Sequence, residues 1–204
     1  MVGEGVLLEC LQNNDVSEVL SISRKTCGIQ HPKLKELLVP DFTKLSGYKN
    51  NIVGYDACFY CAGISSIGMA EEKYHYITYD TTMAFAQAIL EANTVISFCF
   101  VSGRSTDNTE IGKVMWARVK GKTENALSKM SFKSEYNFRP AVMLPFKGQK
   151  NAKASYKLIA KLFKIFAPSS VLTLSEVGKA MIKAVKTSYS QNILEVKDIK
   201  ALIQ

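Results

Sequence analysis

Short, continuously apolar segments alternate with longer segments of helical periodicity along most of this chain. TVISFCFVSG at 94–103 is the clearest apolar segment, and residues 73–93 before it carry apolar side chains at helical spacing. Strands that are apolar on both faces are typical of a parallel sheet that helices cover on both sides. The alternation therefore predicts an α/β fold with a doubly wound, mostly parallel sheet. The other expected strands are 18–24, 35–42, 55–63 and 135–143, and the other expected helices are 4–13 and 110–130.

The pattern changes after Pro145. Residues 152–166 form a basic amphipathic segment with lysines along one side, and we expect a helix there. Thr173 followed by Glu176 predicts a capping box at the start of another helix, and residues 192–196 are expected as a last short strand. The chain is therefore expected to divide into a sheet domain over 1–145 and a small C-terminal helical lobe over 146–204.

The formal net charge of +8 is compatible with either a nucleic acid or an anionic cofactor as partner. The lysines are spread along the chain without an arginine-rich run or interleaved aromatic residues, so we do not expect nucleic-acid binding. The longest apolar runs are far shorter than the roughly 18 residues of a membrane span, and the N-terminus lacks the pattern of a secretory signal. We expect a cytoplasmic protein. Membrane-surface binding by the basic segment 152–166 is an alternative that we do not favour.

The five cysteines predict free thiols, because the count is odd and no secretion pattern is present. Cys58 and Cys61 form a CxxC motif, which also occurs in redox and zinc sites. Here the motif lies in an apolar segment that is expected to be a buried strand, where residues three apart point to opposite faces. No second CxxC completes a metal site, and His31 and His75 are the only histidines. We therefore expect no metal.

Small or polar residues end four of the predicted strands. In an open parallel sheet, ligands bind beyond the carboxyl ends of the strands. A glycine alone often serves only turn geometry, but four such ends in series, after a helix that opens near Gly3, predict a cofactor crevice. The strand ends are Ser23-Arg24-Lys25, Asp41, Ala62-Gly63 and Ser102-Gly103.

With these strand ends in this order, the chain resembles the atypical and extended short-chain dehydrogenase/reductases. Within them it resembles in particular small NAD(P)-binding epimerase-like and Tat-interacting-protein-like oxidoreductases. The resemblance runs from residue 1 to about 200. The family begins with a strand and a turn of the type TGATGxxG, and Gly3 resembles the last glycine of that turn. Ala62 and Gly63 resemble the turn that lines the adenine ribose. Ser102 resembles the catalytic serine of the family.

The helical signature of the extended family is Tyr-x-x-Ser-Lys-x-x-x-Glu, and this chain has WARVKGKTE at 116–124. Lys120 and Glu124 match, whereas Trp116 takes the position of the tyrosine that acts as acid and base. An indole N–H donates a hydrogen bond but does not readily release its proton. Trp116 is then either part of an altered site or an aromatic ring packed over the crevice. FRP at 138–140, ending at Pro140, resembles the segment that passes the nicotinamide.

The predicted strand 18–24 corresponds to the second strand of the family and ends in Ser23, Arg24 and Lys25. Enzymes of the family that use NAD carry a carboxylate at this place. Two cations and a hydroxyl favour a 2′-phosphate, so we expect NADP, with NAD less favoured. Alternatively, Arg24 and Lys25 are an ordinary solvated pair. Asp41 resembles the adenine contact of the family, but it is equally suited to cap the turn that follows it.

Two functions follow from the resemblance. The first is an NADP(H)-binding oxidoreductase or epimerase-like protein, weakly active or inactive, whose small-molecule substrate lies against the lobe 146–204. The second is a non-catalytic NADP(H)-sensing module that acts through a protein partner, so whether the chain is an enzyme stays open.

The resemblance also implies that the first, central strand of the sheet is missing. We expect a gap between the strands at 18–23 and 55–61, or direct pairing of the two. We further expect that the chain is a shortened product of a longer reading frame, started at an internal Met, with weak NADP binding and low stability.

Overall fold

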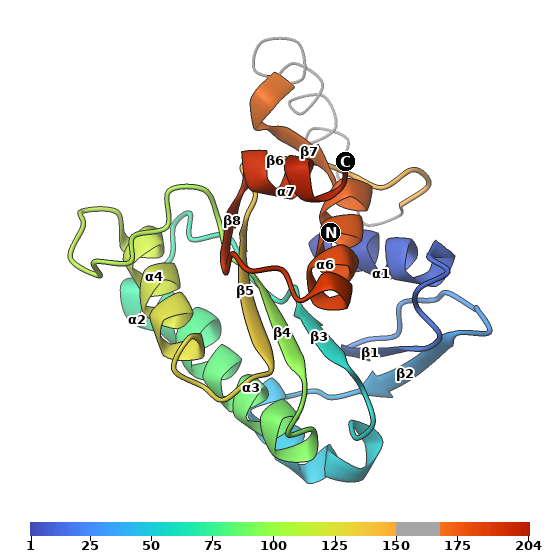
Figure 1. Ribbon diagram of the computed structural model, residues 1–204. Coiled ribbons are helices and arrows are strands. Elements are labelled where there is room, and N and C mark those ends of the chain that lie inside the picture. Colours follow the sequence, from blue (N-terminus) through green and yellow to red (C-terminus); the bar gives the residue numbers. More distant parts are fainter. Residues whose placement is uncertain (150–167) are drawn as a thin grey trace.

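The computed structural model describes residues 1–149 and 168–204, and its main sheet has four parallel strands (Figure 1). The strand order is β3-β4-β5-β8. A separate parallel pair joins β1 to β2, and another joins β6 to β7. The strands are β1 Val19–Ser23, β2 Leu34–Leu38, β3 Ala57–Tyr60, β4 Ser97–Val101, β5 Ser134–Arg139, β6 Val142–Leu144, β7 Val171–Thr173 and β8 Ile193–Glu195.

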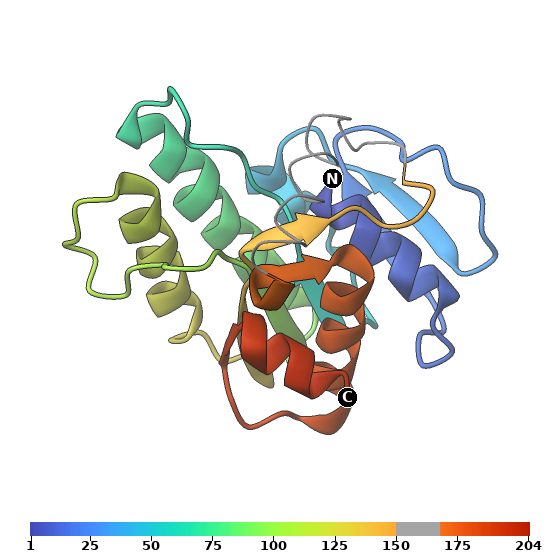
Figure 2. The same cartoon turned by 90° about the horizontal axis from the view of Figure 1, so that it is seen from above.

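Helices cover the main sheet on both faces, as Figure 2 shows from above. One face carries α1 (Val2–Gln12), α6 (Leu174–Thr187) and α7 (Val196–Leu202), and the other carries α3 (Thr81–Ala92) and α4 (Met115–Leu127). The prediction of a doubly wound parallel sheet is therefore confirmed. The shorter helical elements are η1 Phe42–Asn51, α2 Glu71–His75, the π-helical turn η2 Tyr76–Asp80 and η3 Pro168–Ser170.

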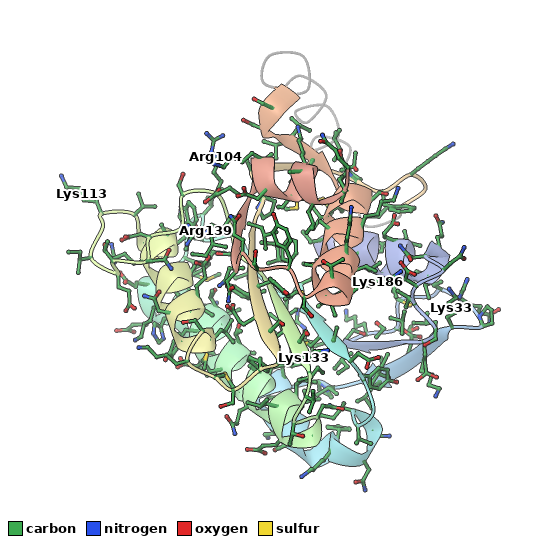
Figure 3. All side chains as sticks on the ribbon, in the orientation of Figure 1. Lys33, Arg104, Lys113, Lys133, Arg139 and Lys186 are labelled. Carbon is green, nitrogen blue, oxygen red and sulfur yellow. The ribbon has the colours of Figure 1, made fainter. Side chains whose placement is uncertain are left out.

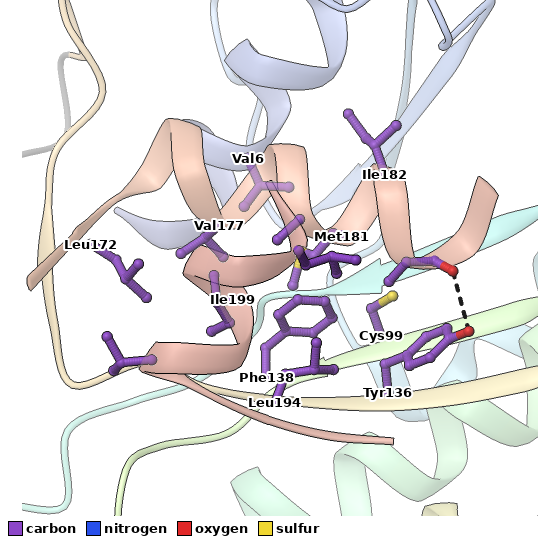
Figure 4. Packing of buried hydrophobic residues seen from close by; sticks show 14 of the residues in the cluster. Val6, Cys99, Tyr136, Phe138, Leu172, Val177, Met181, Ile182, Leu194 and Ile199 are labelled. Atoms are coloured by element: carbon purple, nitrogen blue, oxygen red, sulfur yellow. Dashed lines mark hydrogen bonds between the residues drawn. The ribbon is translucent and has the colours of Figure 1, made fainter. Parts of the chain in front are cut away.

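Each face of the sheet has its own apolar core. The first core lies under α1 and α6, where Val6, Val177 and Met181 pack with Tyr136 and Phe138 of β5 (Figure 4). The second core lies under η1 and α3 and includes Leu45, Ile52, Phe85, Ile89, Tyr60, Phe98, Phe100 and Leu127. Because side chains of successive strand residues point to opposite faces, a strand buried between two such cores must be apolar throughout. This accounts for the continuous apolar runs of the sequence.

The expected gap in the sheet is present between β1 and β3. Within the described residues, β1 pairs only with β2 and β3 only with β4. Val19 of β1 and Phe59 of β3 nevertheless pack against the first core, and Leu20 and Cys58 pack against the second. The two pieces of sheet therefore share both cores, although β1 and β3 do not pair with each other in the described residues.

Several helix and strand boundaries differ from the predicted ones, each for a local reason. The expected helix 110–130 begins only at Met115 because the residues before it form a loop around Asp107, whose carboxylate accepts hydrogen bonds from Thr109 and Gly112. The expected strand 135–143 ends at Arg139, since Pro140 has no N–H for the ladder, and the chain continues as β6 in another sheet. The expected helix 73–93 is divided by the π-helical turn η2.

The C-terminal part joins the main sheet through β8, which pairs with β5. The capping box is confirmed: Thr173 accepts from the Glu176 backbone N–H at 3.1 Å, and the Glu176 carboxylate accepts from the Thr173 N–H at 2.6 Å. The boundary between 145 and 146 stays a prediction, and the expected helix 152–166 lies outside the described residues. In the described ranges, the helices are all too short or too polar for a membrane span.

Candidate active site at the carboxyl edge of the sheet

Ser102 lies at the carboxyl edge of the sheet, directly after β4. Its N–H donates to the Phe138 carbonyl at 2.8 Å, and the Arg104 N–H donates to the Pro140 carbonyl at 3.0 Å, so strand pairing continues past the end of β4. The Thr106 hydroxyl donates to the Gly103 carbonyl at 2.8 Å and lies 2.9 Å from Ser102 Oγ. A hydroxyl has one proton, so Ser102 must be the donor of that second bond. Ser102 therefore retains free lone pairs, whereas its proton is engaged.

Helix α4 brings Lys120 and Trp116 to the same edge. The Nζ of Lys120, a partly buried residue, donates to the Val101 carbonyl at 3.1 Å and lies 5.3 Å from the centre of the Phe100 ring. Burial lowers the pKa of Lys120 to about 8, against an opposing effect of the Glu124 charge. The Trp116 ring lies beside Gly103, where an added Cβ would be 3.5 Å from Trp116 Cζ3. The structure thus brings together Ser102, Trp116 and Lys120, the three residues predicted as catalytic.

A buried ion pair supports this edge, and the sequence analysis did not assign it. Arg139 Nε donates to Glu124 Oε1 at 3.0 Å, and Arg139 Nη2 contacts both Glu124 and Asn108. Arg139, labelled in Figure 3, also forms an ion pair with Glu195 at 3.4 Å. The cluster joins β5, α4, β8 and the loop before α4. The matching Glu124 and the FRP segment were the available signals, but their residues are far apart in sequence and no pattern pairs them.

A second buried carboxyl, Glu135, lies on β5. Within the described residues neither of its carboxylate oxygens has a hydrogen-bond partner, and the residue is only 6% exposed. Burial and, secondarily, the Glu124 charge raise its pKa to about 8. Asn137 opposes this shift, and a pKa of about 8 favours the protonated form of Glu135 at neutral pH.

The residues predicted to bind cofactor form two groups, one on each side of the gap. Gly3, at the start of α1, lies against the end of β3, where an added Cβ would be 3.4 Å from Cys61 Cβ. Ala62 and Gly63 follow there and are exposed, and a Cβ at Gly63 would meet nothing within 4 Å. The contacts of the described residues do not join this group to Arg24, which lies beyond the end of β1.

On the β1 side, Arg24 and Lys25 are exposed, and the Ser23 hydroxyl donates to the Lys25 carbonyl at 2.6 Å. Asp41 caps η1: its Oδ1 accepts from the Thr43 N–H at 3.0 Å and from the Thr43 hydroxyl at 2.6 Å. These bonds lower the pKa of Asp41. The capping role is therefore present in the structure, and the adenine contact stays a prediction.

The CxxC pair is held apart as the strand pattern predicted. Cys58 packs against the second core and Cys61 against the first, and burial raises the pKa of Cys61 to about 12. All five cysteines are free thiols. The described residues contain no cluster of three or more His, Cys, Asp or Glu side chains that is suited to a metal ion.

No protein-family model matches the chain, and no curated protein matches it in sequence. Solved structures do match it. DesIV, a dTDP-glucose 4,6-dehydratase from Streptomyces venezuelae with NAD bound, is 12% identical with a TM-score of 0.68, covering 99% of this chain and 77% of that one. UDP-N-acetylglucosamine 4-epimerase from Bacillus cereus is 18% identical with a TM-score of 0.67, covering 96% and 74%.

A short chain dehydrogenase from Burkholderia cenocepacia in complex with NADP is 11% identical with a TM-score of 0.63, covering 98% of this chain and 86% of that one. At these identities the likeness shows the fold. The chain therefore has the Rossmann-like fold of the short-chain dehydrogenases and nucleotide-sugar epimerases, as the sequence analysis expected.

Proposed function

We propose that the chain binds a nicotinamide dinucleotide along the carboxyl edge of its sheet, with NADP preferred over NAD. The observation that carries the proposal is the convergence of Ser102, Lys120 and Trp116 at the end of β4. The fold adds support, because neighbours of the same fold were solved with NADP or NAD bound. We place the protein in the cytoplasm, with a small molecule or a protein as its partner and no nucleic acid.

The residues present fit such a cofactor. The first turn of α1 has no side-chain cap within the described residues, so its N–H groups are suited to a phosphate. Gly63 leaves open space beside that turn. Arg24 and Lys25, exposed beyond β1, would bind a 2′-phosphate, and Lys120 would bind the nicotinamide ribose. When bound, the cofactor supplies a hydride donor or acceptor.

The side chains at this site are poorly suited to proton transfer. Trp116 does not release its proton, and the Ser102 proton is directed through Thr106 to a backbone carbonyl. Lys120, whose pKa is about 8, is another candidate proton donor, but it is bonded to the Val101 carbonyl. We therefore propose weak oxidoreductase or epimerase-like activity.

The alternative is a non-catalytic NADP(H)-sensing module that acts through a protein partner. Trp116 favours it, because an aromatic ring beside the crevice can change its packing when cofactor binds. The two functions differ in turnover and agree on cofactor binding.

Both functions require cofactor binding. Titration of NADPH and NADH, followed by the fluorescence of Trp116, the only tryptophan, tests this binding. We expect saturable quenching at lower concentration with NADPH than with NADH, and weak affinity for both. Arg24→Asp should remove the preference. Lys133→Asp is the matched control, because it changes an exposed cation before β5 at the opposite edge of the sheet. It should leave the preference for NADPH unchanged. Absence of saturable binding by either cofactor, or equal affinities before and after Arg24→Asp, would reject the assignment.

A further inference from the structure

The carboxylate of Glu124 is deeply buried, and its partners come from outside its own helix. The Glu124 side chain is 1% exposed and that of Arg139 is 9% exposed. Arg139 of β5 donates through Nε to Glu124 Oε1 at 3.0 Å and contacts Oε2 through Nη2. Asn108, in the loop before α4, donates to Oε2 at 3.0 Å. Both oxygens of Glu124 are therefore engaged by groups from β5 and from this loop.

Lys120 lies one helical turn before Glu124 on α4. Side chains four residues apart on a helix are neighbours, and opposite charges at this spacing commonly pair. Here the Lys120 ammonium instead donates to the Val101 carbonyl at 3.1 Å. The Glu124 charge still acts on Lys120, because it opposes the lowering of the Lys120 pKa by burial. The two side chains are therefore close enough to interact, while Glu124 is paired elsewhere.

Removal of the guanidinium would change this pairing. A buried charge without a partner is costly, so Glu124 requires a cation. Without Arg139, the hydrogen bond from the neutral Asn108 would not supply one. Lys120, four residues earlier on the same helix, is the cation placed to replace it. Its ammonium would then leave the Val101 carbonyl at the end of β4.

We propose that Arg139 is a positioning residue that withholds Glu124 from Lys120 and so keeps the Lys120 ammonium at the end of β4. Arginine suits this role because its planar guanidinium binds both oxygens of a carboxylate at once, whereas a lysine is a point charge. Arg139 is itself held by Glu195 of β8 at 3.4 Å. The consequence for the cofactor rests on the proposed function: Lys120 binds the nicotinamide ribose there, so its diversion to Glu124 would weaken NADPH binding.

The pKa of Lys120 reports this pairing without any cofactor. It can be followed by NMR of the lysine Cε carbons, with Lys120→Arg used to assign the signal. In the unmodified chain we expect a pKa of about 8. Arg139→Gln should raise it toward the ordinary 10.5, because the freed Glu124 carboxylate stabilises the ammonium. Glu124→Gln should lower it, because it removes the charge that opposes burial, and the double substitution should reverse the rise caused by Arg139→Gln.

Arg118→Gln is the matched control. It removes another arginine that holds a carboxylate through two hydrogen bonds, here Glu71 at 2.7 and 2.9 Å. That pair is more exposed and is screened by solvent, so the pKa of Lys120 should stay near 8. If Arg139→Gln fails to fold, Arg139→Lys keeps the buried charge but not the bidentate contact, and it should raise the pKa of Lys120 by a smaller amount.

NADPH binding, followed by the fluorescence of Trp116, tests the consequence for the cofactor. Arg139→Gln should weaken NADPH binding about tenfold or more, which corresponds to the loss of one charge-assisted hydrogen bond. The double substitution with Glu124→Gln should recover part of this loss. Failure of the unmodified chain to bind NADPH would reject the proposed function, and the pKa series alone would then decide the role of Arg139.

Four results would overturn this role. A Lys120 pKa near 10.5 in the unmodified chain would show that Glu124 is already paired with it. A pKa that Arg139→Gln leaves unchanged would show that the freed carboxylate does not reach Lys120. Shifts in the same direction in Arg139→Gln and Glu124→Gln, or a rise that the double substitution does not reverse, would show an ion pair that serves only the stability of the fold.

Discussion

Glu135→Gln should make the stability of the protein less dependent on pH. The carboxyl of Glu135 is 6% exposed and unpaired among the described residues, and burial raises its pKa to about 8 from 4.5. Glutamine has the same shape and no ionisation. The variant therefore isolates the cost of burying a titratable carboxyl.

The sign and size follow from proton linkage. Between pH 4.5 and 8 the unfolded chain loses the Glu135 proton while the folded chain retains it, so the free energy of unfolding falls as pH rises. Below pH 4.5 both states are protonated and the penalty is absent. At about 1.4 kcal/mol per pKa unit, the penalty is about 3 kcal/mol at pH 7, and it stops growing above pH 8. Local relaxation and water penetration make these values upper limits.

Urea unfolding of both proteins at pH 5, 6, 7 and 8 measures the effect. The free energy of unfolding of Glu135→Gln, relative to the unmodified chain, should increase at each step. Glu72→Gln, at an exposed carboxylate of α2, is the matched control and should keep the pH profile of the unmodified chain. A difference between Glu135→Gln and the unmodified chain that stays constant over this range would refute the reasoning.

Three further substitutions test packing, catalysis and capping. Gly121→Ala would place a Cβ 1.8 Å from the Asp107 carbonyl oxygen, so urea unfolding should show a loss of about 2 kcal/mol or more, whereas Gly47→Ala, with nothing within 4 Å, should not. Trp116→Tyr should raise carbonyl reductase turnover by roughly 10² to 10⁴ if the missing acid limits the rate, and a fast unmodified protein that tolerates Trp116→Phe would contradict this. Thr173→Ala should lower the free energy of unfolding by about 1 kcal/mol, and Thr173→Ser should restore most of it.

The sequence predicted what depends on local pattern. The continuous apolar run of β4 predicted a strand buried on both faces, and the Thr173–Glu176 spacing predicted the cap of α6. The resemblance, which starts from Gly3, predicted either a gap or direct pairing between β1 and β3, and the structure shows no pairing between them. Each of these signals lies within a few neighbouring residues.

What the sequence did not predict depends on tertiary partners. The Arg139–Glu124 pair joins β5 to α4, and apolar periodicity does not indicate which charged residues will meet in a buried place. The late start of α4 has the same kind of cause, because Gly121 lets the Asp107 loop lie against the helix. Glu135 is of a residue type that is usually exposed, and only its place on a central strand makes it buried.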